Sequence, residues 1–342
     1  MKRASLIQKF IIIASRNMTF SISKKVNKDR KNRFLVIILI TLAVALPLMV
    51  SCLGRTATNE TPTRGNIKII ADESFQPLIE TEVFTFTHLY VNAKIKAEYK
   101  PEFDVINDFM NDSTKVIVTS KKLTDAQIQY LRDTLVVART TTFAYDALAL
   151  VTNKENTDSL MKYNTVKDIF LGKITKWNEI NPKSKLGDIR VIFDNTKSGN
   201  IRYFKDQFGI KDTLGTNFYA VHSNPEVINF VSRNPDALGI VSVNWISNRH
   251  DSLSMSFINK INVVAVSQQF VNDGSYYRPQ QGFIYDKSYP FVREVYLISR
   301  ETFAGLGSGF INWACGEQGQ RIVLKSGLVP ATMPIRLVQI RH

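Results

Sequence analysis

The sequence predicts an α/β protein in which a mostly parallel sheet is covered by helices on both faces. The chain has 342 residues, of which 44% are hydrophobic and 22% charged, and this is the composition of a folded protein with a core. Segments typical of strands alternate with segments typical of helices, and short links join them. Polar residues follow several of the strands, at the edge where such folds bind ligands.

Runs of apolar or alternating residues predict the strands. They cover residues 67–71, 94–99, 115–119, 136–140, 146–152, 189–193, 237–242, 261–267 and 292–299. Apolar residues that recur every three to four positions predict the helices. They cover a segment that ends near residue 86, followed by 101–111, 125–133, 165–171, 201–208, 225–234 and 307–325. The strand over 146–152 is nearly all apolar, so we expect it at the centre of the sheet.

Start and stop signals support several of the helix boundaries. Pro101 and Pro225 stand at helix starts, where a missing N–H group costs nothing. Thr124 is placed to cap the helix over 125–133. Gly316 or Gly319 is expected to break the C-terminal helix.

The net charge of +14 comes mainly from the first 51 residues. These hold ten Lys or Arg residues and one acidic residue, whereas the rest of the chain holds 34 basic and 29 acidic residues. The globular part is therefore only mildly basic and has no dense stripe of Lys and Arg. We expect no nucleic-acid partner, and the charge is compatible with binding a small anion.

A secretion signal is predicted before the globular part. Residues 34–50 form an uncharged apolar run, and six Lys or Arg residues lie in the ten positions before it. The signal peptide is predicted over residues 1–51, and translation from Met18 would give it an ordinary length. The run ends in Ser51 and Cys52, which resembles a bacterial lipobox.

We therefore expect Cys52 to be lipidated after cleavage, with residues 52–65 as a tether. The exported protein would face the periplasm and be lipid-anchored to a bacterial cell membrane. A single membrane-spanning anchor is the alternative, because an apolar run of this length is barely enough to span a bilayer.

No metal site or disulfide framework is predicted. The two cysteines, Cys52 and Cys315, lie at the end of the apolar run and in the predicted C-terminal helix, and the four histidines are scattered. We therefore expect no metal and no cofactor.

The stretch over residues 194–204 is the strongest candidate for a binding site. It crosses a polar turn and enters a helix, so the N–H groups of Ser198, Gly199 and Asn200 lie at a helix start. These groups have no intrahelical acceptor, and the helix dipole favours an anion there. An ordinary capped helix, with Ser198 or Thr196 as the cap, is the alternative.

Other polar residues follow the predicted strands nearer the N-terminus. Ser74 follows the first strand, Glu102 follows the second, and Thr119 and Ser120 end the third. Since the carboxyl ends of parallel strands meet at one edge of a sheet, we expect these residues close together.

Five segments, in a fixed order, carry a resemblance to a known family. They cover residues 72–78, 143–153, 169–178, 235–241 and 310–330. Together they resemble the phosphate-type extracytoplasmic solute-binding proteins of ABC importers, and the segment 169–178, IFLGKITKWN, is the most specific match. The resemblance implies a two-lobe periplasmic binding protein of type II, which closes on a ligand in an interlobe cleft. Lobe I is then expected from residues 66–147 plus about 245–342, and lobe II from 148–244.

The resemblance also implies ligand-binding residues. Ser198, Gly199 and Asn200 fall where the family holds phosphate with a Ser-Gly-Thr loop. Ser74 and Phe75 fall on the first binding loop, where the family donates one hydroxyl and one backbone N–H group.

Two binding segments differ from the family's pattern. Residues 99–103, which include Glu102, replace a Gly/Ser-rich second loop. Thr119 and Ser120 stand where the family has an aspartate that accepts the proton of hydrogen phosphate. We keep both as candidate ligand-binding residues at that strand end.

The family's arginine before the Ser-Gly-Thr loop is also missing. Phe193 and Asp194 stand in its place, and Lys197 or Arg202 can supply the positive charge instead. Glu102 either selects a protonated or cationic ligand or is neutralised by one of these two residues.

We therefore predict a monomeric binding protein, and not an enzyme, that captures a small oxyanion, most of all phosphate, for the permease of an ABC importer. A tethered sensor or interaction protein, or a binder of a different solute, is the alternative on the same fold. A hydrolase is disfavoured, because no histidine can be paired with Ser74 or Ser198 as a general base.

Overall fold

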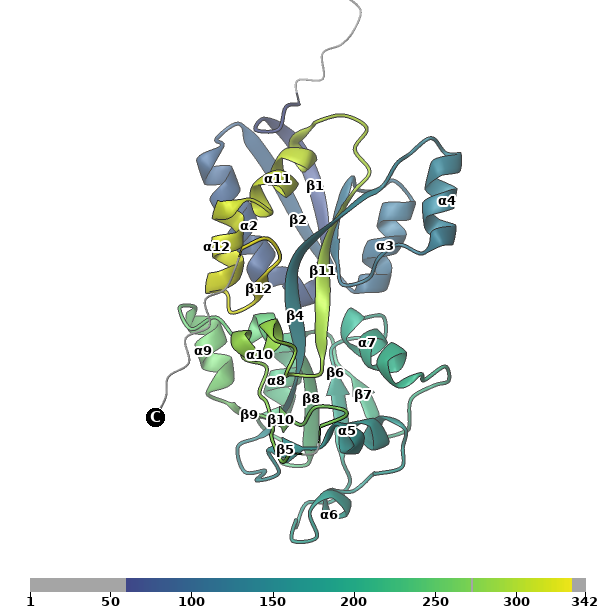
Figure 1. Cartoon of the computed structure of the whole chain (residues 1–342), viewed down its shortest axis with the longest axis vertical. Coiled ribbons are helices and arrows are strands. Elements are labelled where there is room, and N and C mark those ends of the chain that lie inside the picture. Colours follow the sequence, from purple (N-terminus) through teal and green to yellow (C-terminus); the bar gives the residue numbers. More distant parts are fainter. Residues whose placement is uncertain (1–59, 272, 334–342) are drawn as a thin grey trace, which may run out of the picture. The chain divides into compact units, whose positions relative to one another are not determined.

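The computed structural model describes residues 60–271 and 273–333, and Figure 1 shows their arrangement. The predicted signal peptide, the alternative start at Met18 and the lipidation site Cys52 lie outside the described residues. Within these ranges, no helix is both long and apolar enough to cross a lipid bilayer.

Strands and helices alternate along the described chain. The strands are β1 (Gly65–Asp72), β2 (Ala93–Lys100), β3 (Val116–Thr119), β4 (Arg139–Asn153), β5 (Leu160–Met161), β6 (Arg190–Phe193), β7 (Phe218–Ala220), β8 (Ala237–Ser242), β9 (Ile261–Val263), β10 (Ala265–Val266), β11 (Val292–Ser299) and β12 (Val329–Pro330). The α-helices are α2 (Gln76–Leu89), α3 (Glu102–Met110), α4 (Asp125–Asp133), α5 (Tyr163–Phe170), α6 (Trp177–Ile180), α7 (Gly199–Phe208), α8 (Asn224–Val231), α9 (Ser252–Ile258), α10 (Gln281–Tyr285), α11 (Leu306–Ala314) and α12 (Glu317–Lys325). Short 3-10 helices are η1 (Glu73–Phe75) and η2 (Val243–Trp245).

The main sheet has the strand order β2-β1-β3-β11-β4-β8-β6-β7, and β9 and β12 pair with β4. β2, β1 and β3 run parallel to one another, as do β8, β6 and β7. However, β11 is antiparallel to β3 and β4, and β4 is antiparallel to β8. The expectation of a mostly parallel sheet is therefore wrong, because the strands that connect the two lobes run against their neighbours.

The strand β4 belongs to both lobes. It has fifteen residues, which span about 50 Å at about 3.3 Å per residue. Its residues 139–147 pair with β11, and residues 148–153 pair with β8 and β9. The two separate strands predicted over 136–140 and 146–152 are thus one strand, because the residues between them, Thr-Thr-Phe-Ala-Tyr, themselves favour a strand.

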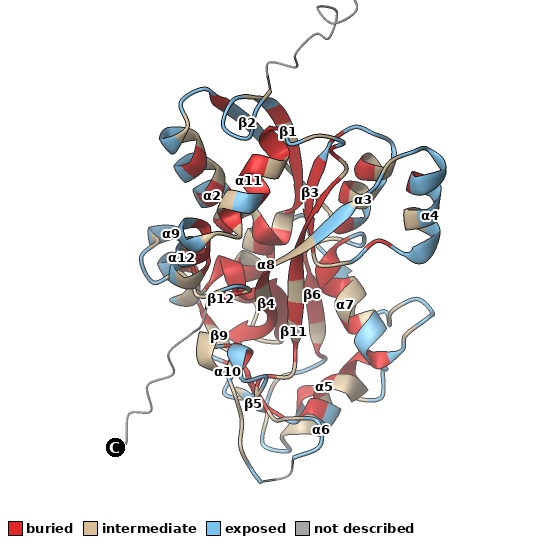
Figure 2. Cartoon of the chain, turned by 45° about the horizontal axis from the view of Figure 1, so that its top comes forward, coloured by how far each residue is buried: buried red, intermediate tan, exposed pale blue. Residues whose placement is uncertain are grey.

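The fold is the predicted two-lobe α/β architecture. In Figure 1, β1 and β2 lie with α2, α3 and α4 in one lobe, where Figure 2 also labels β3, and β6, β7 and β8 lie with α5, α6 and α7 in the other. The central strands are buried and the outer helices expose one face (Figure 2). The predicted residue boundaries of the lobes stay a prediction.

Some element boundaries were predictable and others were not. The helix α4 has the predicted bounds, and Thr124 caps it in a reciprocal pair with Gln127. The predicted strand over 261–267 divides into β9 and β10 on either side of Val264. The C-terminal helix divides after Ala314, and Gly316 begins its second part.

Aromatic packing fixes the orientation of α7. The ring centroids of Phe204 and Phe170 lie 4.6 Å apart, and those of Phe204 and Phe291 lie 4.9 Å apart. Phe204 is fully buried. Since the interior side of α7 is held in this way, its first residues keep a fixed position between the lobes.

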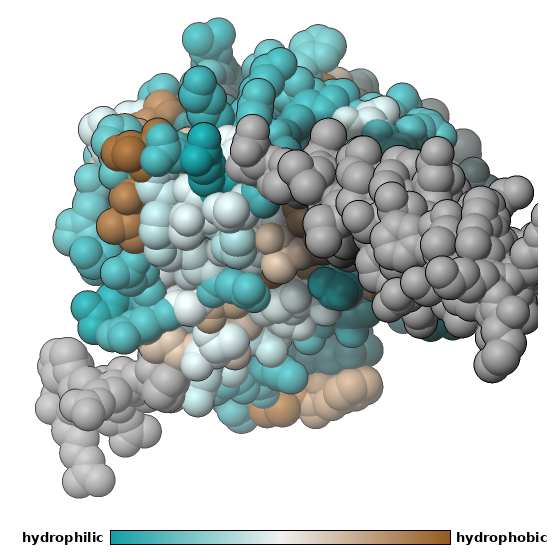
Figure 3. All heavy atoms as spheres, turned by 90° about the horizontal axis from the view of Figure 1, so that it is seen from above, coloured by the Kyte–Doolittle hydropathy of each residue, from teal (hydrophilic) through white to brown (hydrophobic). Residues whose placement is uncertain are grey.

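The visible surface is mostly hydrophilic when the molecule is seen from above, and hydrophobic residues form small separate groups (Figure 3). Phe84, Leu89 and Val91 are exposed at and after α2. Isolated apolar side chains of this kind are usual on a protein surface.

Candidate functional site

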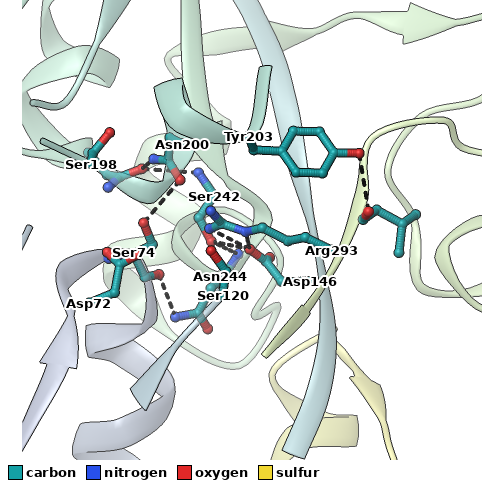
Figure 4. Close-up of polar contacts among 12 residues, drawn as sticks. Asp72, Ser74, Ser120, Asp146, Ser198, Asn200, Tyr203, Ser242, Asn244 and Arg293 are labelled. Carbon is teal, nitrogen blue, oxygen red and sulfur yellow. Dashed lines mark hydrogen bonds and ion pairs between the residues drawn. The ribbon is translucent and has the colours of Figure 1, made fainter. Parts of the chain in front are cut away.

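Polar side chains from both lobes meet where strands of the main sheet end (Figure 4). All of them are buried. They are Asp72, Ser74, Glu102, Thr119, Asp146, Asp194, Ser198, Asn200, Asn224, Ser242, Asn244 and Arg293. We call this set the cleft cluster.

The start of α7 presents backbone N–H groups to the cleft cluster. Ser198 is the N-cap, and its hydroxyl accepts a bond from the N–H of Ile201 at 3.4 Å. The same hydroxyl donates to Asp194 Oδ1 at 2.6 Å. Gly199 and Asn200 are the first two residues of the helix, so their N–H groups have no intrahelical acceptor.

Gly199 allows two carboxylates to approach the start of α7. A Cβ atom at this position would lie 2.7 Å from Asp72 Oδ2 and 2.9 Å from Glu102 Oε1. Only glycine fits there without movement of these side chains. The chain's own carboxylates therefore lie at the helix end that favours negative charge.

The first binding loop is joined to α7 by a hydrogen bond between the lobes. The Ser74 hydroxyl donates to Asn200 Oδ1 at 3.0 Å, and the Ser74 N–H donates to Asp72 Oδ1 at 3.0 Å. Asn244 Nδ2 donates to the Ser74 carbonyl at 3.1 Å. Phe75, whose N–H group was predicted to bind the ligand, is fully buried beside Ser74.

Glu102 is neutralised by Arg202, one of the two candidates that the sequence left open. Arg202 forms an ion pair with Glu102, and Lys197 lies 3.0 Å from Asp104 Oδ1 instead. Burial alone would raise the pKa of Glu102. The Arg202 guanidinium nevertheless holds this pKa below its ordinary value.

Thr119 and Ser120 also bind Glu102. Glu102 Oε1 accepts bonds from Thr119 Oγ1 at 3.1 Å, from Ser120 Oγ at 2.6 Å and from the Ser120 N–H at 3.1 Å. The hydroxyls of Ser74, Ser198, Thr119 and Ser120, which were predicted to bind the ligand, thus all donate to oxygens of the chain itself.

An ion pair that was not predicted from the sequence joins the two strands that connect the lobes. Arg293 of β11 lies with its Nε 2.9 Å and its Nη2 2.8 Å from Asp146 Oδ2 of β4. Its guanidinium carbon lies 4.9 Å from the ring centroid of Phe75. Arg293 is 4% exposed, and its Nη1 has no hydrogen-bond partner among the described residues. The signal available in the sequence was that Asp146 and Arg293 are charged residues inside largely apolar strands, where a charge needs a partner.

A model of the PBP (periplasmic binding protein) superfamily domain matches residues 56–318. This chain belongs to the PBP superfamily. The match covers most of the chain, including every residue of the cleft cluster.

Curated relatives and solved structures are similar to this PBP-superfamily chain over most of its length. The phosphate-binding protein PstS of Borreliella burgdorferi is 21% identical over 277 residues, which cover 77% of this chain and 89% of that protein. PstS of Staphylococcus aureus is 22% identical over 236 residues, which cover 68% of this chain and 71% of that protein. A structure from Clostridium perfringens, assigned as a phosphate ABC transporter substrate-binding protein with bound phosphate, has a TM-score of 0.66 and 23% identity, and the match covers 78% of this chain and 100% of that one.

The cleft cluster of this PBP-superfamily member holds more acidic than basic side chains. Burial, together with the nearby charge of Glu102, raises the pKa of Asp72 to about 7. Burial likewise raises the pKa of Asp194 to about 7 and that of Glu73 to about 7. Near neutral pH these carboxyl groups are partly protonated, and a protonated carboxyl group can donate a hydrogen bond.

Asn224 links the acidic groups of the two lobes. Its backbone N–H donates to Glu73 Oε1 at 3.1 Å, and its Nδ2 donates to Asp194 Oδ2 at 3.3 Å. Its Oδ1 accepts a bond from Asn200 Nδ2 at 3.2 Å. The described residues contain no group of three His, Cys, Asp or Glu side chains arranged to hold a metal ion.

Proposed function

We propose that this chain is an extracytoplasmic binding protein that captures phosphate between its lobes and delivers it to the permease of an ABC importer. The curated relatives named above are phosphate-binding proteins, and the similar Clostridium perfringens structure holds phosphate. The observation that carries the proposal for this chain is the buried guanidinium of Arg293, whose Nη1 has no partner in the described chain.

The Arg293 guanidinium compensates for the arginine that is absent at Asp194. A buried donor without an acceptor costs about 1 to 3 kcal/mol, and a hydrogen bond to a charged group contributes about 1.5 to 3 kcal/mol. An oxyanion that accepts a hydrogen bond from Nη1 would remove the cost of the unpaired donor and add the free energy of a charged hydrogen bond. The ion pair with Asp146 holds the guanidinium in place for this contact.

The start of α7 and the first loop complete the donor set. The N–H groups of Gly199 and Asn200 and the dipole of α7 favour an anion, and the Ser74 hydroxyl and the Phe75 N–H group face it from the other lobe in this proposal. To bind there, phosphate must displace the carboxylate of Asp72 from the helix start, where it lies now.

The remaining parts of the proposal concern the location and state of the protein. We infer that Cys52 carries a lipid, that the protein is anchored outside a bacterial cell membrane as a monomer, and that it performs no chemistry. Metabolic labelling with a palmitate analogue tests the anchor. The label should enter the wild-type chain and be absent from Cys52→Ser, and equal labelling of both would reject the anchor.

Calorimetric titration of the full chain with phosphate tests the ligand. We expect saturable binding with a Kd well below about 1 mM, weaker binding of sulfate, and a loss of about tenfold to a hundredfold in Arg293→Lys, which keeps the charge but not the forked donors. Binding of phosphate by Arg293→Lys with the affinity of the wild type would remove Arg293 from the site. No saturable binding by the wild type would reject phosphate.

The carboxylates of the cleft cluster favour a second candidate, a binder of a different solute on the same fold. Asp72 and Glu102 lie at the start of α7, and Asp194 stands where the family has an arginine. A solute that brings hydrogen-bond donors or a positive charge would pair with them. Native mass spectrometry of the full chain with a panel of small anions, amines and amino acids distinguishes the two candidates.

A further inference from the structure

A pocket of about 930 Å³ lies among η2, α9, β9, α10 and the end of α12. These elements gather on one side of the molecule in Figure 1. No residue of the cleft cluster lines this pocket, so it is separate from the proposed phosphate site. Its volume lies within the range of about 300 to 1,000 Å³ that is usual for small-molecule sites.

The charged side chains at the mouth of the pocket are all basic. They are Lys154, Arg249, Arg278 and Lys325, each of them exposed, and no Asp or Glu lines the pocket. They come from four separate segments of the chain, so they are brought together by the fold and do not form a charged run. In the described ranges, none of the Lys and Arg residues among them forms an ion pair with a carboxylate.

The floor of the pocket is apolar. Val243 and Ile246 reach it from η2 and the residue after it, and Ile258 and Ile261 reach it from α9 and β9. Val243, Ile246 and Ile261 are buried, and Met255, which also lines the pocket, is 38% exposed. The pocket therefore combines an apolar floor with a cationic mouth.

We propose that this pocket binds a monomeric anionic amphiphile, that is, a ligand with an apolar body and a phosphate or carboxylate head. The body would lie on the apolar floor and gain from the removal of apolar surface from water. The head would meet Arg249 and Arg278, whose forked donors suit both phosphate and carboxylate. A nucleic acid or an acidic peptide fits less well, because neither has an apolar body to cover the floor.

Titration of the full chain with dodecyl phosphate, below the concentration at which it forms micelles, tests the proposal by native mass spectrometry. We expect one molecule to bind saturably. Exchange of Arg249→Glu together with Arg278→Glu should weaken binding at least tenfold. The matched control exchanges Lys183→Glu and Lys211→Glu, two exposed residues outside the pocket, and should bind like the wild type. All variants share residues 1–59, so any contribution of this segment cancels in the comparison.

A second variant keeps the test independent of the charges. Ile258→Trp fills the apolar floor and should also abolish binding, while a circular dichroism spectrum and an unfolding midpoint like those of the wild type show that the chain is folded. Equal binding of dodecyl maltoside, whose head is neutral, would overturn the proposal, and so would unchanged binding of dodecyl phosphate in both pocket variants. The proposal would also be wrong if inorganic phosphate bound to the pocket as tightly as dodecyl phosphate, or if the chain bound only to vesicles that contain phosphatidylglycerol.

Discussion

The cleft cluster and the side pocket use charge in opposite ways. In the cleft cluster, the charged groups are buried, and acidic groups outnumber the one arginine, Arg293, which is ion-paired to Asp146. The half-buried Arg202 pairs with Glu102 from outside the cluster. In the pocket, the charged groups are basic and exposed at the mouth, and no Asp or Glu lines the pocket. Burial explains the difference, because an unpaired charge is tolerated in water but is costly in a protein interior. The following predictions test the cleft side of this comparison.

The largest effect is expected when the buried ion pair loses one partner. Arg293→Met leaves the carboxylate of Asp146 buried without its cation, which should lower the free energy of unfolding by about 3 to 5 kcal/mol and abolish phosphate binding. Chemical denaturation and calorimetry measure the two effects. In the double variant with Asp146→Leu, much of the stability should return but phosphate binding should not. An equal loss of stability in the single and double variants would show that charge is not the cause.

Gly199→Ala should weaken phosphate binding by about tenfold to a hundredfold, or about 1.4 to 2.8 kcal/mol. The new Cβ atom would lie within 3 Å of carboxylate oxygens of Asp72 and Glu102, so the lobes cannot approach fully. Gly187→Ala is the control, because no atom lies within 4 Å of a Cβ there. Unchanged affinity in Gly199→Ala would mean that the lobes need not approach to this distance when ligand binds.

The acidic groups of the cleft should make the folded state less stable as the pH rises. Burial raises the pKa of Asp72, Glu73 and Asp194 to about 7 in the folded state. Between about pH 4 and pH 7, these groups keep protons in the folded state that the unfolded chain has lost. Their contribution to the free energy of unfolding is therefore complete below about pH 4, decreases as the pH rises, and is lost above about pH 7.

Thermal unfolding between pH 5 and pH 8 measures this loss. For Asp194, we expect the free energy of unfolding to fall by about 2 to 3 kcal/mol across that range, and Asp194→Asn should remove this share. The exposed Asp188→Asn is the control and should leave the slope unchanged. A wild-type stability that rises from pH 5 to pH 8 would contradict the prediction.

The smallest effect is expected at Glu102. Glu102→Ser removes a carboxylate from the start of α7 and frees Arg202, so phosphate should bind up to about tenfold more tightly. The control is Asp206→Ser, which removes the exposed partner of Arg202 at 2.8 Å and leaves Glu102 in place. Calorimetry of both variants with phosphate measures whether Glu102 weakens anion binding. Equal phosphate affinities of Glu102→Ser and the wild type would show that it does not.

The sequence was sufficient for the fold class and for many elements, because apolar periodicity reports which side of a segment is buried. It predicted α4 with its cap at Thr124 and the bounds of β11, and it placed a helix start at residues 198–200, with Ser198 as one of two candidate caps of α7. It failed where local preference is ambiguous, as between residues 136 and 153, where one long strand was divided into two.

The site was less predictable than the fold, because its contacts join residues far apart in the chain. Glu102 and Arg202 are a hundred positions apart, and the sequence offered Lys197 as an equal partner. Asp146 and Arg293 are separated by 147 positions and each lies in an apolar strand, so periodicity identified their strands and not their pairing. Such pairings depend on how strands are ordered in the sheet.

The shared strand β4 also has a consequence for the order in which the molecule folds. Its partners in the main sheet are β8, β9, β11 and β12, all of which follow it in the chain, and the last of them ends at Pro330. The lobe that holds β1, β2 and β3 cannot complete its sheet until β11 and β12 have joined it, whereas β8 and β9, which pair with the other half of β4, come earlier in the chain. Folding of that lobe should therefore be slow, as is usual for proteins rich in contacts between sequence-distant residues, and loss of the last strands should destabilise it more than the other lobe.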